Sequence, residues 1–344
     1  MQINNVDLSV FSFNFDFSWA VFFLNSDLTV YGRYGTRSNQ SPESHVTVPS
    51  MVNAMKRVLE LHRNYPKNKK EFAGKKLLRS KMKWKTPEQI PALGRFVKNR
   101  PNFKKPFPSN CIHCHQVAEA IAATSATSGQ PVPDEVIWPY PLPEAIGINI
   151  DRNHGTKVES LVRKGLAAKS RLKPGDIILS INGQTIISIA DIQWVLHHTK
   201  DRSTLKIKVQ RSGKEKELSL KLKGKWRKTE NSWGGVGRNK ILPRANIQPV
   251  PDAEKRRLGI SSKRMALRIV NAWPRTQKAG FKDGDIFIRI DNKSNNMSLL
   301  DLIVYLGKKC VRKKALPVII LRKDSSGKYK QIKMTLQLDP NYLG

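Results

Sequence analysis

The sequence predicts a chain of mixed α/β architecture that becomes mostly β in its second half. Its first 65 residues read strand, turn, strand and helix. A basic stretch rich in proline follows, and a strand-rich module then occurs twice, with the copies about 110 residues apart. A length of 344 residues is sufficient for two or three small domains with cores of their own.

Residues 1–65 are the predicted α/β region. The apolar run Trp19–Leu24 is typical of a buried strand, Asn25–Asp27 has turn chemistry, and Thr29–Tyr31 begins a second strand. A helix is expected from about Pro49 to Arg63, because the apolar residues of this stretch share one helical face. Those residues, with one histidine, are Val52, Met55, Val58, Leu59 and His62.

Residues 66–143 are predicted to be a basic linker. Lysine and proline are frequent up to residue 110 and the hydrophobic periodicity is weak, which favours an extended or wrapping segment. A short helix is expected from about Cys114 to Thr124. The prolines of Gly129–Pro143 indicate a second linker segment.

The duplicated module is recognisable from a block of glycine, aspartate and aliphatic residues. Lys173–Gly183 in the first copy is echoed by Lys282–Asn292 in the second. In each copy a Ser-x-x-Asp sequence, which begins at Ser188 or Ser298, predicts a helix N-terminus. The predicted boundaries are 144–223 for the first copy, 224–256 for a linker and 257–338 for the second copy.

The chain is strongly basic, with 62 Lys and Arg against 27 Asp and Glu and a net charge of +35. Residues 1–55 hold two basic and four acidic residues, whereas residues 56–105 hold seventeen and three. Such a run of charge is usually a solvated surface, and the alternative is that it binds acidic proteins or an anionic membrane surface. A nucleic-acid partner is not expected, because the sequence has neither an aromatic ladder nor a known nucleic-acid-binding motif. No apolar run is long enough for a membrane span, and no signal peptide is found.

Both copies of the module resemble PDZ domains of the bacterial type. The resemblance rests on the Gly-Asp-Ile-Ile-Leu-Ser-Ile-Asn-Gly block that ends at Gly183 and on its echo. It also rests on the preceding segments Ile146–Ile148 and Leu258–Ile260 and on the helix that follows each block. The resemblance implies two small, partly open β-barrels, each with a groove in which a protein C-terminus or an extended peptide adds as a strand.

The PDZ resemblance also implies which residues bind the peptide. Backbone N–H groups before the groove strand would hold the terminal carboxylate, and aliphatic side chains would line the groove. Each of these aliphatic residues could instead be an ordinary core residue. The implied residues are Ile146, Gly147, Ile148, Ile150, Ile189, Ile192 and Leu196 in the first copy and Leu258, Gly259, Ile260, Leu299, Leu302 and Leu306 in the second.

The segment Cys111-Ile-His-Cys114-His115 has the C-x-x-C-H pattern of c-type haem attachment. The two thiols would bond the haem vinyl groups, and His115 would ligate the iron. Two alternatives stay open: a zinc site that adds His113 or His115, and a redox-active thiol pair. No second Cys pair accompanies the motif, since Cys310 is the remaining cysteine. The motif could also have no function of its own.

A second axial ligand would decide the role of the haem iron. His62 is the first candidate, because it extends the apolar face of the helix expected at residues 49–63. His197, on the expected groove helix of the first module, is the second candidate. Either histidine could simply be a packed side chain.

Over almost its whole length, the chain resembles multidomain proteins of planctomycetes and related bacteria. These combine a thioredoxin-like start, a C-x-x-C-H segment and two PDZ modules. The resemblance is carried by segments such as Phe13–Asp16, Tyr31–Gly35, Cys111–Gln116 and Ala190–His197. It implies a periplasmic or other cell-envelope location. A complete thioredoxin-like domain needs an earlier strand and helix, so residues 1–65 are expected to be a truncated remnant.

The predicted fold class is therefore a truncated thioredoxin-like α/β region, a linker with the haem motif, and two PDZ β-barrels. The favoured function is a cell-envelope adaptor that carries haem c for a redox or electron-transfer role and binds peptide tails. The alternative is a haem-free peptide-binding scaffold whose Cys pair binds zinc or is redox-active. An enzymatic role is not expected, because the sequence has no Gly-x-Ser-x-Gly or His-Glu-x-x-His motif and no protease-sized domain.

Overall fold

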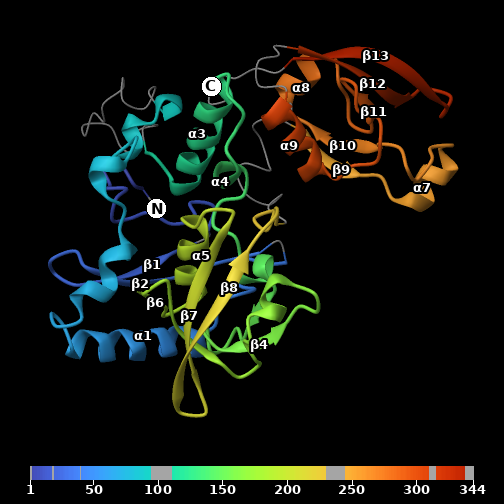
Figure 1. The fold of residues 1–344 in the computed structure, drawn as a ribbon. Helices are drawn as coiled ribbons and strands as arrows, with labels where there is room; N and C mark the ends of the chain where they lie inside the picture. The colour runs from blue at the N-terminus through green and yellow to red at the C-terminus, as the bar shows by residue number, and fades with distance from the viewer. Residues whose placement is uncertain are drawn as a thin grey trace. The chain divides into compact units, whose positions relative to one another are not determined.

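The computed structural model describes residues 2–17, 19–38, 40–93, 111–229, 245–309 and 315–337. The chain divides into two compact units, and Figure 1 shows their elements. One unit combines Met1–Val117 with Trp138–Glu230, and the other combines Ala118–Ile137 with Asn231–Gly344. Each unit is thus built from segments that are far apart in the sequence.

The first unit begins with β1 (Val21–Leu24) and β2 (Val30–Tyr34), which form an antiparallel hairpin, followed by α1 (Val48–Arg63). The predicted order of strand, turn, strand and helix is confirmed. Thr47 caps α1, because its side chain accepts a hydrogen bond from the Ser50 N–H. The thioredoxin-like origin of residues 1–65 stays a prediction.

Residues 66–93 pack onto the first unit as a series of 3-10 turns. Leu77 N–H donates to Ser9 O (3.1 Å), and Leu8 N–H donates to Lys85 O (2.9 Å). The hydrophobic periodicity of the segment is weak because it forms short turns, three of which bury one or two side chains, such as Phe72. The turns are η1 (Lys69–Lys75), η2 (Arg79–Lys81), η3 (Pro87–Gln89) and η4 (Pro91–Leu93). Residues 94–110 of the predicted linker lie outside the described residues.

Two helices lie in the second half of the predicted linker. The helix expected from Cys114 is confirmed as α3 (Cys114–Thr127). The short α4 (Asp134–Ile137) lies within the proline-rich segment and follows Pro133, which is consistent with the preference for proline at helix starts. No helix in the described ranges has both the length and the apolar character needed to cross a membrane.

The first module completes the first unit and contains two sheets. β3 pairs with β4 in one sheet, and the other has the order β6-β5-β7-β8. Their side chains share one core with α5. The elements are η5 (Pro143–Ile146), β3 (Ile148–Ile150), β4 (Val158–Leu161), η6 (Leu166–Lys169), β5 (Ile177–Ile181), β6 (Gln184–Thr185), α5 (Ile189–His197), β7 (Ser203–Arg211) and β8 (Lys214–Leu222).

The second module forms a single antiparallel sheet in the order β13-β12-β11-β10-β9. α9 packs on the core of this sheet through Leu302 and Leu306. The elements are β9 (Ala245–Pro249), α7 (Asp252–Arg257), β10 (Leu267–Ala272), α8 (Pro274–Lys278), β11 (Ile286–Ile290), α9 (Leu299–Lys309), β12 (Ala315–Lys323) and β13 (Tyr329–Gln337).

A buried ion pair at the same place in each module supports the predicted duplication. Arg211 binds both carboxylate oxygens of Asp176 at 2.6 and 2.7 Å. Arg322 does the same with Asp285 at 2.8 and 2.7 Å. Both aspartates are almost fully buried. The bidentate geometry satisfies each buried carboxylate and anchors β5 and β11 to the strand beside them.

Strand register corrects one part of the predicted correspondence between the modules. Val158 and Ile269 occupy equivalent positions. The backbone N–H of each donates to the backbone carbonyl of the aspartate in its Gly-Asp-Ile block, and its own carbonyl accepts from the N–H of the glycine before that aspartate. Val158 pairs with Ile150 of β3, and Ile269 pairs with Ile247 of β9. β9 therefore takes the place of β3, and the segment Leu258–Ile260 does not. Leu-Gly-Ile resembles Ile-Gly-Ile only in its local sequence, whereas the register of a strand is fixed by its pairing with another strand of the sheet.

The predicted boundaries at residues 65 and 143 do not separate compact units. Ser188 Oγ at the start of α5 donates to Arg33 O (2.5 Å), and Arg33 Nη2 donates to Lys75 O (2.6 Å). The α/β start, the basic segment and the first module thus share one interior.

Candidate peptide-binding grooves and the Cys-x-x-Cys-His segment

The loop before β3 is a tight turn that ends at Gly147. Glycine is favoured there because φ is +84° and a Cβ atom would lie 3.1 Å from the Gly165 Cα. Gly147 N–H donates to Glu144 O (3.0 Å), and Gly147 O accepts from Val162 N–H (3.0 Å). A backbone N–H group expected to hold a peptide carboxylate is therefore bonded within its own loop.

The groove helix of the first module is enclosed. Every residue of α5 from Ile189 to Leu196 is buried. A helix at the rim of an open groove would expose one face to water. The aliphatic residues predicted to line the groove are likewise buried in the core: Ile146, Ile148, Ile150, Ile189, Ile192 and Leu196.

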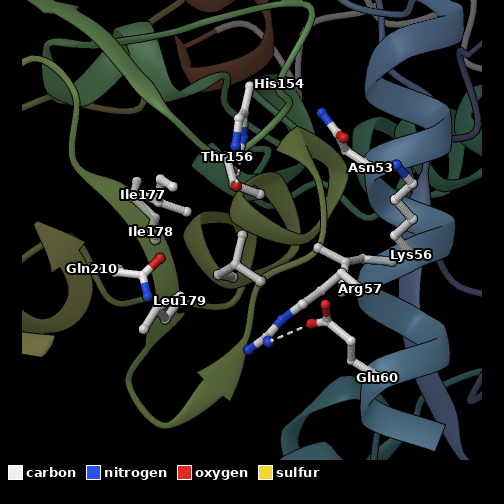
Figure 2. A pocket seen from close by; sticks show the side chains of 12 residues that line it. Asn53, Lys56, Arg57, Glu60, His154, Thr156, Ile177, Ile178, Leu179 and Gln210 are labelled. Carbon is white, nitrogen blue, oxygen red and sulfur yellow. Dashed lines mark hydrogen bonds and ion pairs between the residues drawn. The ribbon is translucent and has the colours of Figure 1, made fainter. Parts of the chain in front are cut away.

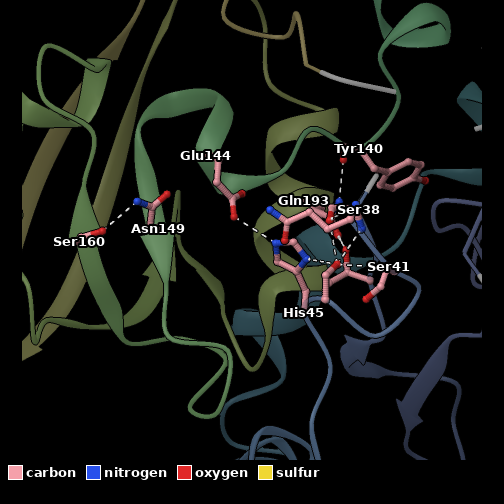
Figure 3. A network of polar contacts seen from close by, with 11 residues as sticks. Ser38, Ser41, His45, Tyr140, Glu144, Asn149, Ser160 and Gln193 are labelled. Atoms are coloured by element: carbon pink, nitrogen blue, oxygen red, sulfur yellow. Dashed lines mark hydrogen bonds and ion pairs between the residues drawn. The ribbon is translucent and has the colours of Figure 1, made fainter. Parts of the chain in front are cut away.

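A polar network covers the face of α5 that carries Gln193 (Figure 3). Thr36 Oγ1 donates to Gln193 Oε1 (2.5 Å), and Gln193 Nε2 donates to Tyr140 O (2.7 Å). His45 Nε2 lies 3.1 Å from Glu144 Oε1, in the turn before β3. The segment after β2 thus approaches both the helix and the loop that border the predicted groove.

The same segment also contacts the other end of β3. Arg152 Nη2 donates to Glu43 O (3.4 Å), and Thr47 Oγ1 donates to Arg152 O (3.2 Å). Arg152 follows β3 by two residues. Residues 43–47 therefore contact the chain just before and just after β3.

A buried charge cluster that sequence reasoning missed joins α5 to the basic segment. Lys75 Nζ lies 2.9 Å from Asp191 Oδ2, and the two side chains are 1% and 2% exposed. Arg33 N–H donates to Asp191 Oδ1 (3.2 Å). Burial lowers the pKa of Lys75 to about 8, although Asp191 acts in the opposite direction. Lys75 is one of many lysines in a lysine-rich stretch, so no local pattern identifies it.

In the second module, the residues predicted for the groove separate into two places. Leu302 and Leu306 of α9 are buried in the core with Ile247 of β9, and Leu299 packs against that core. Leu258 and Ile260 instead pack against another cluster, while Gly259 is exposed. The loop before β9, which corresponds to the loop before β3, lies outside the described residues.

The Cys-x-x-Cys-His segment lies at the start of α3 and is held to the N-terminus of the chain. Ile3 N–H donates to Ile112 O (2.8 Å), and Ile112 N–H donates to Asn4 Oδ1 (2.9 Å). Cys111 and Cys114 are half-buried free thiols. The motif thus presents its thiols from a fixed backbone.

The histidines near the motif are exposed. The rings of His113 and His115 lie nearly parallel, with centroids 5.9 Å apart. His62 is also exposed, and its Nδ1 lies 2.8 Å from the Tyr31 hydroxyl. Among the residues that the structure describes, no three His, Cys, Asp or Glu side chains gather as a metal site. The haem, zinc and redox interpretations stay predictions, as does the sixth-ligand role of His62.

A cavity of about 290 Å³ opens between α1 and β5 (Figure 2). Lys56 and Arg57 of α1 border it on one side and Ile177 and Ile178 of β5 on the other. Arg57 Nη1 donates to Glu60 Oε2 (3.2 Å). The cavity contains none of the residues predicted to bind a peptide or a cofactor, and its mixed lining identifies no reaction.

Comparisons with known proteins support the PDZ assignment of the first module. Residues 144–222 match the PDZ domain family. A probable periplasmic serine endoprotease DegP-like of Pseudomonas savastanoi pv. phaseolicola is 28% identical over 157 residues, 44% of this chain and 32% of the relative. A protein of the same description from Hahella chejuensis is 24% identical over 183 residues, 52% of this chain and 38% of the relative. A serine protease HtrA-like of Staphylococcus epidermidis is 34% identical over 80 residues, which are 23% of this chain and 14% of the relative.

The fold and these comparisons define a chain that contains a PDZ domain. The chain covers at most 38% of the length of each of these three relatives. PDZ domains bind peptides and protein C-termini as a class. The second module follows the same strand register as the first, although the PDZ match covers only residues 144–222.

Proposed function

We propose that the chain is a cell-envelope adaptor that binds protein C-termini or extended peptides through two PDZ modules. The observation that carries this proposal is the repeated pairing of a short strand with a helix, β3 with α5 and β9 with α9, at equivalent register. β9 is the edge strand of its sheet, and an extended peptide can add to such an edge. The envelope location is proposed because several relatives are described as periplasmic.

Peptide binding is tested with fluorescent short peptides that end in an aliphatic residue, each with a free and an amidated C-terminus. The full chain is expected to bind the free-acid forms at micromolar concentration and to lose affinity for the amides. Hydrogen exchange of the β9 or β3 amides should slow in the complex, because a peptide that adds as a strand pairs with them. Equal binding of acids and amides, with unchanged exchange in both strands, would contradict the proposal.

Haem attachment at Cys111, Cys114 and His115 is the second candidate function. It is supported by the donor set: two unpaired thiols on a fixed backbone and an exposed imidazole next to them. A bound haem would supply one-electron chemistry. The chain would contribute two thioether bonds and one axial imidazole from His115, and His62 is the proposed second axial ligand.

Haem attachment is tested by co-expression of the exported chain with a cytochrome c maturation system. Covalent haem should survive denaturing electrophoresis and be detected by its peroxidase activity. Cys111→Ser and Cys114→Ser variants should each weaken or abolish the signal. An unstained band from a well-expressed chain would reject this function and leave peptide binding unaffected.

A further inference from the structure

The two groove helices are covered by their own chain at matching positions. α5 follows the capping Ser188, and α9 follows Ser298, whose Oγ accepts from the Asp301 N–H (3.1 Å). The fifth residue after the serine is Gln193 in α5 and Ile303 in α9. Gln193 is bonded to residues outside its module, and Ile303 belongs to a buried cluster formed with residues that precede both modules.

The cover of α9 is apolar along the first turns of the helix. Ala122 of α3 and Val136 of α4 pack with Ile303 and Leu299 in one cluster. Residues 118–137 belong to the same compact unit as α9. Leu299 also packs against the core that contains Ile247 of β9, so it connects this cover to the groove.

Polar contacts hold the same cover at the end of α9. Val132 N–H donates to Gly307 O (2.9 Å), one of the last carbonyl groups of the helix. Lys308 Nζ lies 2.5 Å from Asp134 Oδ1, and these side chains are 27% and 34% exposed. α3, α4 and the segment between them thus contact α9 from its first turn to its last.

We infer that each groove helix is a docking site for segments of this same chain, residues 33–38 and 43–47 with Tyr140 on α5 and residues 122–136 on α9. An incoming peptide therefore competes with an internal occupant. This inference rests on the proposed peptide-binding function and adds its regulation. It is carried by the burial of Ile189–Leu196 in α5, by the contacts of residues 43–47 around β3, and by the packing of Leu299 against both the groove core and the cover.

The two covers differ in strength. The cover of α5 includes the buried hydrogen bonds of Gln193 with Thr36 and Tyr140, which are costly to break. The cover of α9 includes a small apolar cluster and one partly exposed ion pair, and such pairs contribute little. The second module should therefore open first and bind peptide at lower concentration.

The test measures how strongly full-length variants bind the tightest free-acid peptide of the set described above. Val136→Asn places an amide in the apolar cluster, and Asp134→Asn removes the ion pair with Lys308. Matched controls are Val270→Asn, at a valine of β10 that is 43% exposed, and Glu135→Gln, at the exposed neighbour of Asp134. Each cover variant should bind roughly two- to tenfold more tightly, because a competing closed state lowers apparent affinity.

The possible outcomes separate the inference from the function on which it rests. Tighter binding by both cover variants, with the controls at the level of the unmodified chain, supports internal competition. Equal affinity in all five proteins would overturn the inference and leave peptide binding intact. Failure of every protein to bind, with native circular dichroism in each, would overturn both. Asp134→Asn retains the apolar packing, so the test does not depend on the folding of Val136→Asn alone.

Discussion

Asp191 connects three parts of the first unit through a single carboxylate. It accepts N–H groups from Arg33 of β2 and from Ile187 before α5, and it faces the ammonium group of Lys75. All of these contacts are buried, so water cannot replace them. Loss of the charge at Asp191 would leave the ammonium group of Lys75 in the interior without its carboxylate.

We expect Asp191→Asn to lower the free energy of unfolding of the first unit by about 3 kcal/mol, because an unpaired buried charge remains. Adding Lys75→Met should recover part of the loss, since the double variant has no buried charge at this place. Urea denaturation followed by tryptophan fluorescence measures both effects. Asp201→Asn is the control, because the Asp201 side chain is 52% exposed and its pair with Arg227 should contribute less than about 1 kcal/mol.

His197 should make the first unit less stable in acid. Burial lowers the pKa of His197 well below its usual value, and His198 and Arg227 act in the same direction. Its Nδ1 accepts the Tyr140 N–H (3.4 Å), so a proton there would break that bond. Below the unfolded pKa of about 6.5, the unfolded chain binds a proton that the folded chain does not, and stability falls as pH falls.

The expected loss from His197 is up to about 1.4 kcal/mol for each pH unit below 6.5. Urea denaturation at pH 7.5 and pH 5.0 measures it. His197→Asn should reduce the difference between the two pH values, because asparagine does not titrate. His115→Asn, at an exposed histidine, is the control. An unchanged pH dependence in His197→Asn would exclude His197 as its source.

Between elements, β2 approaches α5 so closely that only glycine fits at residue 32. A Cβ atom there would lie 2.3 Å from the Ile187 side chain and 2.8 Å from Asp191 Oδ2. Gly32→Ala should therefore destabilise the first unit by about 1–3 kcal/mol through overpacking. Ile187→Ala should cost less in the Gly32→Ala background than in the unmodified chain, as a double-mutant cycle in urea can show. Additive effects would contradict the close contact.

Elements defined by local pattern were predictable, and elements defined by distant pairing were not. The Gly-Asp-Ile block marks β5 and β11, and Ser188 and Ser298 mark the starts of α5 and α9, because turn and capping chemistry are local. Leu258–Ile260 resembles Ile146–Ile148 in sequence, but the position predicted for it was wrong. It follows α7, which separates it from β9, the strand that takes the place of β3. Only the pairing of Ile247 with Ile269 reveals the register.

The candidate site likewise contains some residues that a local pattern predicts and others that only tertiary packing brings together. The C-x-x-C-H motif is contiguous, so its position at the start of α3 was predictable. The contact of Thr36 with Gln193 joins residues 157 positions apart, and Lys75 meets Asp191 through tertiary packing alone. No local sequence pattern therefore predicts that other segments of the chain cover the groove helices.

At the scale of the whole molecule, the domain organisation itself is testable. The sequence suggested that residues 1–65 and the first PDZ module fold separately, whereas the structure joins them through buried contacts around α5. The packing of Trp194 in α5 depends on residues before the module. The Arg33 guanidinium lies 3.7 Å from the centre of the Trp194 ring, and Trp194 Nε1 donates to Gly74 O (3.0 Å). Removal of residues 1–93 would expose this side chain and its neighbours to water.

A chain that begins at residue 111 should therefore lose the stability of its first module while keeping that of its second. Two thermal transitions are expected in the full chain, one for each unit, and only the transition of the first unit should shift down or disappear. Binding of a hydrophobic dye should rise, because the uncovered face of α5 is apolar around Trp194. The second module retains residues 118–137 and β9–β13, so its transition is the internal control. Two unchanged transitions would show that the residues before 111 contribute nothing to the stability of the first module, and the domain boundaries predicted from the sequence would then stand.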